Sequence, residues 1–372
     1  MRRLQFCFLL LGIALFVFVV GKVGPGSIFH GLSLVGWSFL TIFGLELVID
    51  ALHSEGWRWC LPAPARAVSR LDVFLARTAG VAVNVLTPTA SVGGEVVKGM
   101  LLRRWVPLAD GFASVIVDKL TFAIGQALFL VMGLLAVLGG LSFSPQERAV
   151  ALAALAVWIA AVVAFFLFQR AGIFRVGLGA VRAMFGGSVL ERLPGHAAEF
   201  DAKVATFLRS HHRELAASSL MHLLAQFARV PQLYLALSAL GLDPTAATSF
   251  TTAAGLVFME ATLFLIPAKL GVLEGGNAVI FVRLGYSAAD GIVVAFVMRL
   301  SELASVLLGL CALGYYHFRP WSETLTNGGT DLKSIPLPAA KDSEAAGSSP
   351  AASRGFTDSV IGSSKQQPPP SS

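Results

Sequence analysis

Ten ionisable side chains lie inside or beside segments that are otherwise strongly apolar. Five are acidic and five are basic: Glu95, Lys98, Asp118, Lys119, Arg229, Glu260, Lys269, Glu274, Arg299 and Glu302. An ionised side chain near the centre of a bilayer costs roughly 2.5–3.5 kcal/mol on insertion scales, so membrane proteins keep few without a partner or a task. For any one of these residues, neutralisation of an acid by a base is the alternative to a functional role.

The chemistry available to this set is the binding of a charged head group. The lysines and arginines could contact phosphate, since a guanidinium offers a forked set of donors. Glu95 and Glu274 could bind a proton or an ammonium group. The spread of both signs therefore indicates a polar pocket for a zwitterionic or anionic head group whose tails remain in lipid.

The composition predicts an integral membrane protein. The chain has 372 residues, of which 55% are hydrophobic and 13% are charged, and its mean hydropathy is +0.73. Soluble domains contain about a quarter charged residues. The net charge of +6 comes from scattered basic residues without a clustered basic face, which argues against a nucleic-acid partner.

The sequence contains no recognisable catalytic or metal-binding pattern. Cys7, Cys60 and Cys311 form neither a CxxC pair nor an even framework, so we expect no disulfide and no zinc site. "GEVVKG" lacks the phosphate-loop pattern, and no G-x-S-x-G elbow is present. We therefore expect no enzyme activity, no metal and no cofactor.

Six apolar segments are long enough to cross about 30 Å of hydrocarbon. They cover residues 4–20, 28–49, 111–139, 149–168, 215–240 and 291–316. The first could also be a signal peptide, but it is long for one and no A-x-A cleavage site follows, which favours an anchor. Lysines and arginines collect in alternate loops, which predicts that both termini are cytoplasmic.

Two further apolar regions, 71–104 and 245–283, are each broken near the middle by proline and glycine. The helix expected over 90–103 would span about 20 Å, too short for a crossing. A re-entrant hairpin fits better, and irregular backbone at that depth requires a protein interior or a wet cavity. The residues expected to form the hairpin turns are Pro88, Gly93, Gly94, Pro267, Gly271, Gly275 and Gly276.

The two broken regions share their landmarks. Pro88 precedes Glu95 by seven residues, as Pro267 precedes Glu274, and Lys119 and Arg299 each lie nine residues past an Asp-Gly pair. These spacings predict an internal repeat with copies at about 28–140 and 215–317. Because a single span separates the copies, the second would be inverted, as in many transporters.

The predicted fold is therefore an all-α integral membrane protein with about six full transmembrane helices and two re-entrant hairpins. The membrane domain covers residues 1–319 and includes a cytoplasmic connector at about 170–213. Residues 320–372 are rich in Ser, Pro, Gly and Ala, which predicts a disordered cytoplasmic tail.

Three segments carry a family resemblance: "NVLTPTASVGGEVVKGMLLRR", "SVIVDKLTFAIGQALFLVMGLL" and "LIPAKLGVLEGGNAVIFVRLGYSAADGIVVAFVMRLSEL". They resemble the membrane domain of lysylphosphatidylglycerol synthases and its stand-alone, flippase-like relatives over about residues 5–318. The "GWRWCLP", "GGEVV" and "PAKLGVLEGG" segments are most similar to hopanoid-associated membrane proteins. Where the family often has Glu-Arg, this chain has Asp118-Lys119.

The resemblance implies a bacterial inner-membrane protein that moves or presents a lipid and has no enzyme activity in this domain. Our leading hypothesis is a flippase or transporter of a phospholipid or hopanoid-type lipid, with membrane lipids as partners. The alternative is a lipid-binding partner of a lipid-biosynthetic enzyme that docks through the connector. An intramembrane enzyme is a third hypothesis, which the missing catalytic pattern disfavours.

Overall fold

A computed structural model describes residues 35–86, 92–140, 194–262 and 272–318, with isolated positions at 26, 33 and between 145 and 167. All regular structure in these residues is helical, which confirms the predicted all-α class. The described helices belong to one compact unit, residues 1–329.

The described helices form two series with similar lengths. The first series contains α3 (Ser38–Trp59, 22 residues), the short 3-10 helix η1 (Ala63–Ala67), α4 (Arg70–Leu86, 17), α5 (Val92–Leu102, 11) and α6 (Leu108–Gly140, 33). The second contains α10 (His212–Ala239, 28), α11 (Ala246–Thr262, 17), α12 (Val272–Arg283, 12) and α13 (Ala288–Phe318, 31), and α9 (Pro194–Ser210) precedes it. Each series runs long, medium, short and long.

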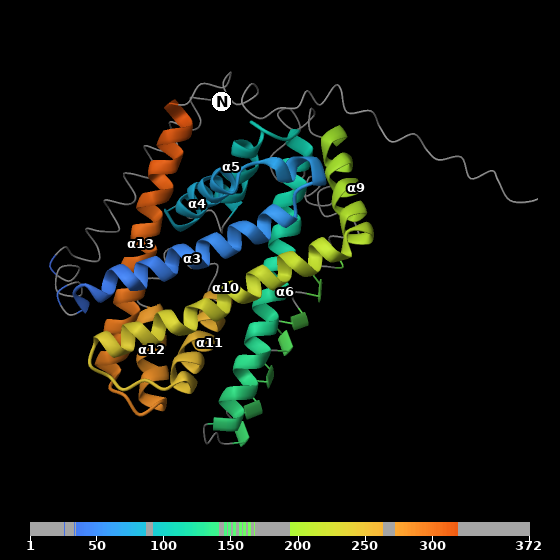
Figure 1. Ribbon diagram of the computed structural model, residues 1–372. Coiled ribbons are helices and arrows are strands. Elements are labelled where there is room, and N and C mark those ends of the chain that lie inside the picture. The colour runs from blue at the N-terminus through green and yellow to red at the C-terminus, as the bar shows by residue number, and fades with distance from the viewer. Residues whose placement is uncertain are drawn as a thin grey trace, which may run out of the picture. The chain divides into compact units, whose positions relative to one another are not determined.

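The long helices α6 and α13 begin at corresponding turns. Ser287 and Asp290 form a reciprocal cap at the start of α13: the Ser287 hydroxyl donates to the Asp290 carboxylate at 2.7 Å and accepts from the Asp290 amide at 3.1 Å. In Figure 1, α5 and α12 lie toward opposite ends of the helical unit, and α6 and α13 run in opposite directions between them.

The two series pack against each other reciprocally. Helix α3 runs beside α10, α13 packs on α4, and α6 packs on α11 (Figure 1). Small residues permit these approaches: Gly309 on α13 meets the backbone of Thr78, and Gly133 on α6 meets Ala254. The last helix of each series, α6 or α13, therefore contacts the medium helix of the other series.

Two of the described helices, α6 over Leu108–Ala136 and α13 over Ala288–Phe318, are long and apolar enough to cross a membrane. The whole helices α6 and α13 contain the predicted spans at 111–139 and 291–316. The span at 215–240 lies in α10, one continuous helix that is less apolar and contains Pro231. The span at 4–20 lies outside the described residues, and 149–168 is described only at scattered positions. The prediction of six crossings is thus supported in part.

Helix α3 differs from the predicted span at 28–49. It continues to Trp59, because the polar residues that follow Ile49 find partners on other helices. Asp50 pairs with Arg77 on α4 at 2.7 Å, and His53 pairs with His222 on α10 at 2.8 Å. The apolar stretch in the sequence ends at Asp50, and the charge of Asp50 is neutralised by Arg77 on another helix.

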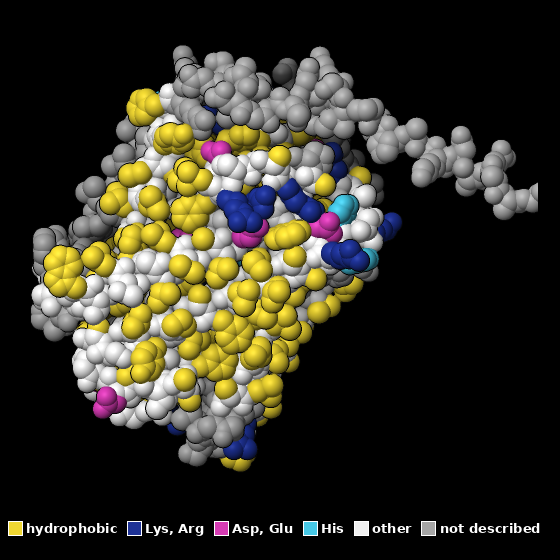
Figure 2. All heavy atoms as spheres, in the orientation of Figure 1, with side chains coloured by type: hydrophobic (Ala, Val, Ile, Leu, Met, Phe, Trp, Pro, Cys, Tyr) yellow, Lys and Arg dark blue, Asp and Glu magenta, His cyan; other side chains and the backbone are white. Residues whose placement is uncertain are grey.

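The surface agrees with a membrane location. Figure 2 shows apolar side chains spread over the face that α3 and α10 form, with most charged side chains in the upper part of the view and a few at its lower edge. Leu220, Leu224 and Tyr234 on α10 are each more than 40% exposed. Exposed apolar surface of this extent suits contact with lipid.

Candidate functional site

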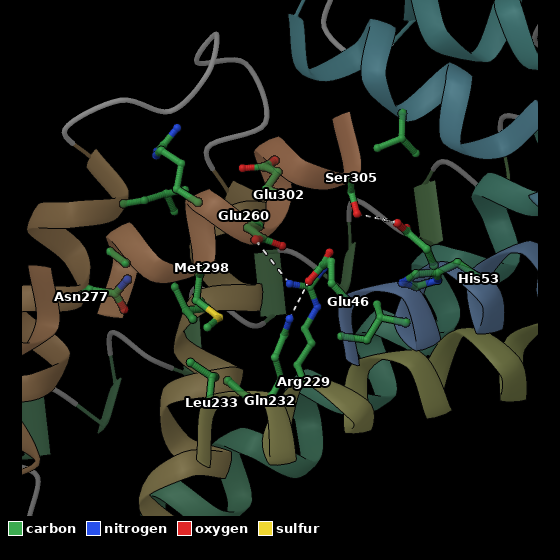
Figure 3. Close-up of a pocket in the computed structure, with 18 of the residues that line it drawn as sticks. Glu46, His53, Arg229, Gln232, Leu233, Glu260, Asn277, Met298, Glu302 and Ser305 are labelled. Carbon is green, nitrogen blue, oxygen red and sulfur yellow. Dashed lines mark hydrogen bonds and ion pairs between the residues drawn. The ribbon is translucent and has the colours of Figure 1, made fainter. Parts of the chain in front are cut away.

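A cavity of about 230 Å³ lies where helices of both series meet. Its volume is below the range of drug-sized ligand pockets, so it fits a head group better than a whole lipid. Charged side chains of both signs line it: Glu46, Asp50, Arg77, Arg229, Glu260, Arg299 and Glu302. His53, Gln232, Asn277 and Ser305 are among its other polar residues. Figure 3 shows Glu46, Arg229 and Glu260 between Asn277 on one side and His53 on the other.

One wall of the cavity is held by a buried ion pair. The Arg77 guanidinium on α4 donates to the Asp50 carboxylate on α3 at 2.7 Å, and both side chains are about nine-tenths buried. Ser305 on α13 donates to the other Asp50 oxygen at 3.2 Å. Because three helices contribute to this group, it ties the two series together as well as lining the cavity.

The centre of the cavity holds a looser pair. Arg229 on α10 lies 3.7 Å from Glu260 on α11, and each side chain remains about a quarter to a third exposed. Gln232, one turn further along α10, donates to Glu46 on α3 at 2.7 Å (Figure 3). A long, partly exposed pair gains little from its own Coulomb attraction. Arg229 lies in the cavity beside the two acids Glu46 and Glu260.

Asn277 on α12 is the least satisfied polar side chain of the cavity. It is fully buried, and neither its amide nitrogen nor its amide oxygen has a hydrogen-bond partner among the described residues. An unpaired buried polar group costs about 1–3 kcal/mol. Because Asn277 lines the cavity, its partner is expected to be a molecule that enters that space.

A second cluster of charges joins α5 to α6. Glu95 on α5 forms ion pairs with Lys98 at 3.0 Å and with Lys119 on α6 at 2.7 Å, and Lys98 lies 3.7 Å from Asp118. Asn84 on α4 also donates to Glu95 at 3.1 Å. Two acids and two bases make this cluster neutral, and Lys98 and Asp118 are almost fully buried.

Two histidines connect the cluster to the cavity. The Nε2 atom of His222 lies 3.1 Å from Asp118 Oδ1, and its Nδ1 atom lies 2.8 Å from Nδ1 of His53. His53 in turn lines the cavity. The charges of α5 and α6 and those of the cavity thus belong to one connected polar system.

The structure places eight of the ten predicted ionisable residues in these two groups. Glu95, Lys98, Asp118 and Lys119 form the cluster, and Arg229, Glu260, Arg299 and Glu302 line the cavity. Lys269 lies outside the described residues. Glu274 lies in α12, and the direction of its side chain is not described.

Four of the glycines expected in the hairpin turns lie within helices instead, which corrects the prediction for these four. Gly93 and Gly94 lie within α5, and Gly275 and Gly276 lie within α12. Gly94 contacts the backbone of α4, and Gly276 packs against Met259 on α11. At these two positions the missing side chain allows close helix packing. Pro88, Pro267 and Gly271 lie outside the described residues.

Sequence reasoning missed several polar residues of the site. These are Glu46, Asp50, His53, Arg77, Asn84, His222, Gln232 and Asn277. Glu46, Asp50 and His53 recur every three or four residues along α3, a helical spacing that puts them on one face. That spacing is the one sequence signal that could have found them.

The fold and site define an all-helical membrane protein with a polar cavity inside an apolar bundle. The chain belongs to the family of the lysylphosphatidylglycerol synthase TM region, whose model matches residues 6–309. It is 26% identical over 327 residues to a UPF0104 membrane protein of Methanothermobacter thermautotrophicus, covering 83% of this chain and 94% of the relative. No solved structure matches the chain significantly.

Proposed function

We propose that this protein is a lipid flippase or transporter that moves a polar head group through the cavity while the apolar part of the lipid stays in the bilayer. The observation that carries the proposal is the cavity itself, in which charges of both signs from both helix series surround the Asn277 amide, which no described residue pairs with. A phosphate would contact Arg229, and an ammonium or hydroxyl group would contact Glu46 or Glu260. The substrate is a phospholipid or a hopanoid-type lipid, and no bond in it is made or broken.

The proposal includes an inverted repeat with two re-entrant hairpins, α4–α5 and α11–α12. Its support is the matching order and length of the two series, together with α5 and α12 at opposite ends in Figure 1. Helices α5 and α12 extend only about 17 Å and 18 Å at 1.5 Å per residue. In a bacterial inner membrane, both termini would lie on the cytoplasmic side.

The register of the repeat accounts for the position of the cavity. When Glu95 is aligned with Glu274, Lys98 corresponds to Asn277. The Asp-Gly pairs likewise align Asp118 with Met298. The first copy buries a lysine and neutralises it with its own aspartate, whereas the second has neutral side chains at both positions. The second copy can therefore line an open cavity where the first forms a closed cluster.

Leaflet exchange in vesicles tests the proposal. The full chain is reconstituted with fluorescently labelled phosphatidylglycerol, phosphatidylethanolamine or a labelled hopanoid, and the outer leaflet is bleached by dithionite. We expect exchange of at least one of these lipids, and about a tenfold loss with Arg229→Gln, the effect of removing a hydrogen bond to a charged group.

Arg209→Gln is the matched control, because Arg209 is exposed at the end of α9, away from the cavity. It should leave exchange unchanged. Absence of exchange for every lipid, with the protein correctly inserted, would contradict the proposal. Lipid binding without exchange would favour a non-transporting partner of a biosynthetic enzyme instead. In that case α9, which is tied to α6 by Lys203 and Asp110 at 2.6 Å, would be the docking element to test.

A further inference from the structure

The two buried histidines form a rigid link between the cavity and the first charge cluster. His53 is 3% exposed and His222 is 1% exposed. The Phe122 ring lies 5.3 Å from the His53 ring and 5.6 Å from the His222 ring. A Cβ atom on Gly56 would lie 2.8 Å from Nε2 of His222, so the His222 ring rests against the α3 backbone. Both rings are thereby held in place.

The hydrogen bonds define which ring nitrogens carry protons. When Asp118 is ionised, it only accepts, so His222 must donate from Nε2. The Nδ1 atom of a neutral His222 then accepts from Nδ1 of His53. The Nε2 atom of His53 is left without a proton and is the nitrogen available to the cavity that His53 lines.

We infer that His53 and His222 conduct protons between the cavity and Asp118, a proton-transfer activity beyond lipid movement. A proton from the cavity binds Nε2 of His53, and the Nδ1 proton of His53 passes to Nδ1 of His222. The Nε2 proton of His222 then passes to Asp118 Oδ1. The result is a neutral Asp118 and two neutral histidines with reversed tautomers. One proton has entered, and every bond broken is matched by one formed.

Protonation of Asp118 changes the balance of the charge cluster. Lys98 loses the carboxylate 3.7 Å away, and Glu95 alone then faces Lys98 and Lys119. A neutral buried cluster gains one positive charge, which is unfavourable away from water. The relay would therefore favour a rearrangement of α5 against α6. If the proposed function holds, this rearrangement couples proton entry to lipid movement.

Charged groups on every helix around the two rings set the pH at which the relay works. They are Glu46 and Asp50 on α3, Arg77 on α4, Glu95 and Lys98 on α5, Asp118 and Lys119 on α6, Arg229 on α10, Glu260 on α11, and Arg299 and Glu302 on α13. The acids favour proton entry and the bases oppose it. Groups of both signs therefore lie around the relay.

Histidine tautomers test the relay without any transport assay. The full chain, with its seven histidines labelled with nitrogen-15, is examined by solid-state NMR in vesicles between pH 5 and pH 9. At high pH we expect His53 protonated at Nδ1 and His222 at Nε2, with both tautomers reversed at low pH. Signals are assigned by their loss in His53→Gln and His222→Gln. Fixed tautomers across this range, or a His222 imidazolium beside an ionised Asp118, would overturn the relay.

A pH gradient across lipid vesicles tests the coupling. We expect an inward proton gradient to change the rate of labelled-lipid exchange about tenfold, a typical coupling between two sites. His222→Gln should abolish this dependence, whereas the exposed His212→Gln should retain it. Exchange that ignores the gradient would overturn the coupling and leave the proposed lipid transport standing. Absence of exchange would instead count against lipid transport, and the tautomers would still decide the relay.

Discussion

Gly94 on α5 lies directly against the backbone of Gly80 on α4. A Cβ atom on Gly80 would lie 2.7 Å from the Gly94 carbonyl oxygen, and a Cβ atom on Gly94 would collide with the Gly80 carbonyl oxygen. This approach lets the Gly94 amide donate to Asn84 at 2.6 Å, and Asn84 in turn donates to Glu95 at 3.1 Å. Backbone contact between the two helices thus orients the first charge cluster.

A methyl group at this contact should destabilise the protein. Gly94→Ala is expected to cost about 1–3 kcal/mol, the usual range for overpacking, because the obstructing atoms belong to the backbone. The measurement is the midpoint of thermal unfolding in detergent. Gly44→Ala is the matched control, because no described residue lies within 4 Å of its added Cβ and alanine favours the helix. Equal midpoints for the two variants would refute the contact.

Substitutions of Arg77 and Asp50 should change the free energy of unfolding non-additively. Arg77→Met leaves a buried carboxylate without its guanidinium and is expected to lower stability by about 3–5 kcal/mol. Adding Asp50→Asn removes that charge and keeps an acceptor for Ser305, so the double variant should recover most of the loss. A double-mutant cycle of unfolding free energies measures the coupling. Additive losses would show that the two side chains do not interact.

Asn277 is expected to lower the stability of the protein and to favour ligand binding. Asn277→Leu removes an unpaired buried amide at similar volume and is expected to raise stability by about 1–3 kcal/mol. The same change should weaken lipid exchange or binding, since the ligand loses its amide partner. Ser249→Ala is the control: its hydroxyl is also buried and has no hydrogen-bond partner in the described part of the chain, but it does not line the cavity. Loss of exchange with Ser249→Ala, or its retention with Asn277→Leu, would exclude this role.

The inverted arrangement predicts access from opposite sides of the membrane. Leu108 and Ala288 occupy equivalent exposed positions at the starts of α6 and α13. In a chain without other cysteines, Leu108→Cys and Ala288→Cys should react with an impermeant maleimide from opposite faces of oriented vesicles. Labelling of both from one face would rule out the inverted repeat.

Hydropathy located the longest apolar helices, because that signal is local. The predicted spans at 111–139 and 291–316 fall within α6 and α13. Local patterns also indicated the two broken regions, where proline and glycine interrupt apolar sequence. The same patterns placed the glycines of α5 and α12 in turns, because glycine at a backbone contact and glycine in a turn look alike in sequence.

The charged residues within apolar sequence indicated much of the site. They did not indicate which side chains contact one another. Lys98 and Asp118 could be singled out because each interrupts an apolar stretch. Asp50 and His53 could not, because they follow an apolar stretch and resemble the polar end of a span. Their partners, Arg77 and His222, lie 27 and 169 residues away on other helices.

The sequence by itself determined that this chain is helical and apolar, that two of its regions are broken, and that these regions carry ionisable residues. Each of these properties depends on neighbouring residues along the chain. Only the tertiary structure decided that Asp118 meets His222, that His53 reaches the cavity, and that the Asn277 amide has no partner among the described residues. Such contacts depend on how each helix is rotated against its neighbours, and side-chain packing across the whole bundle sets that rotation.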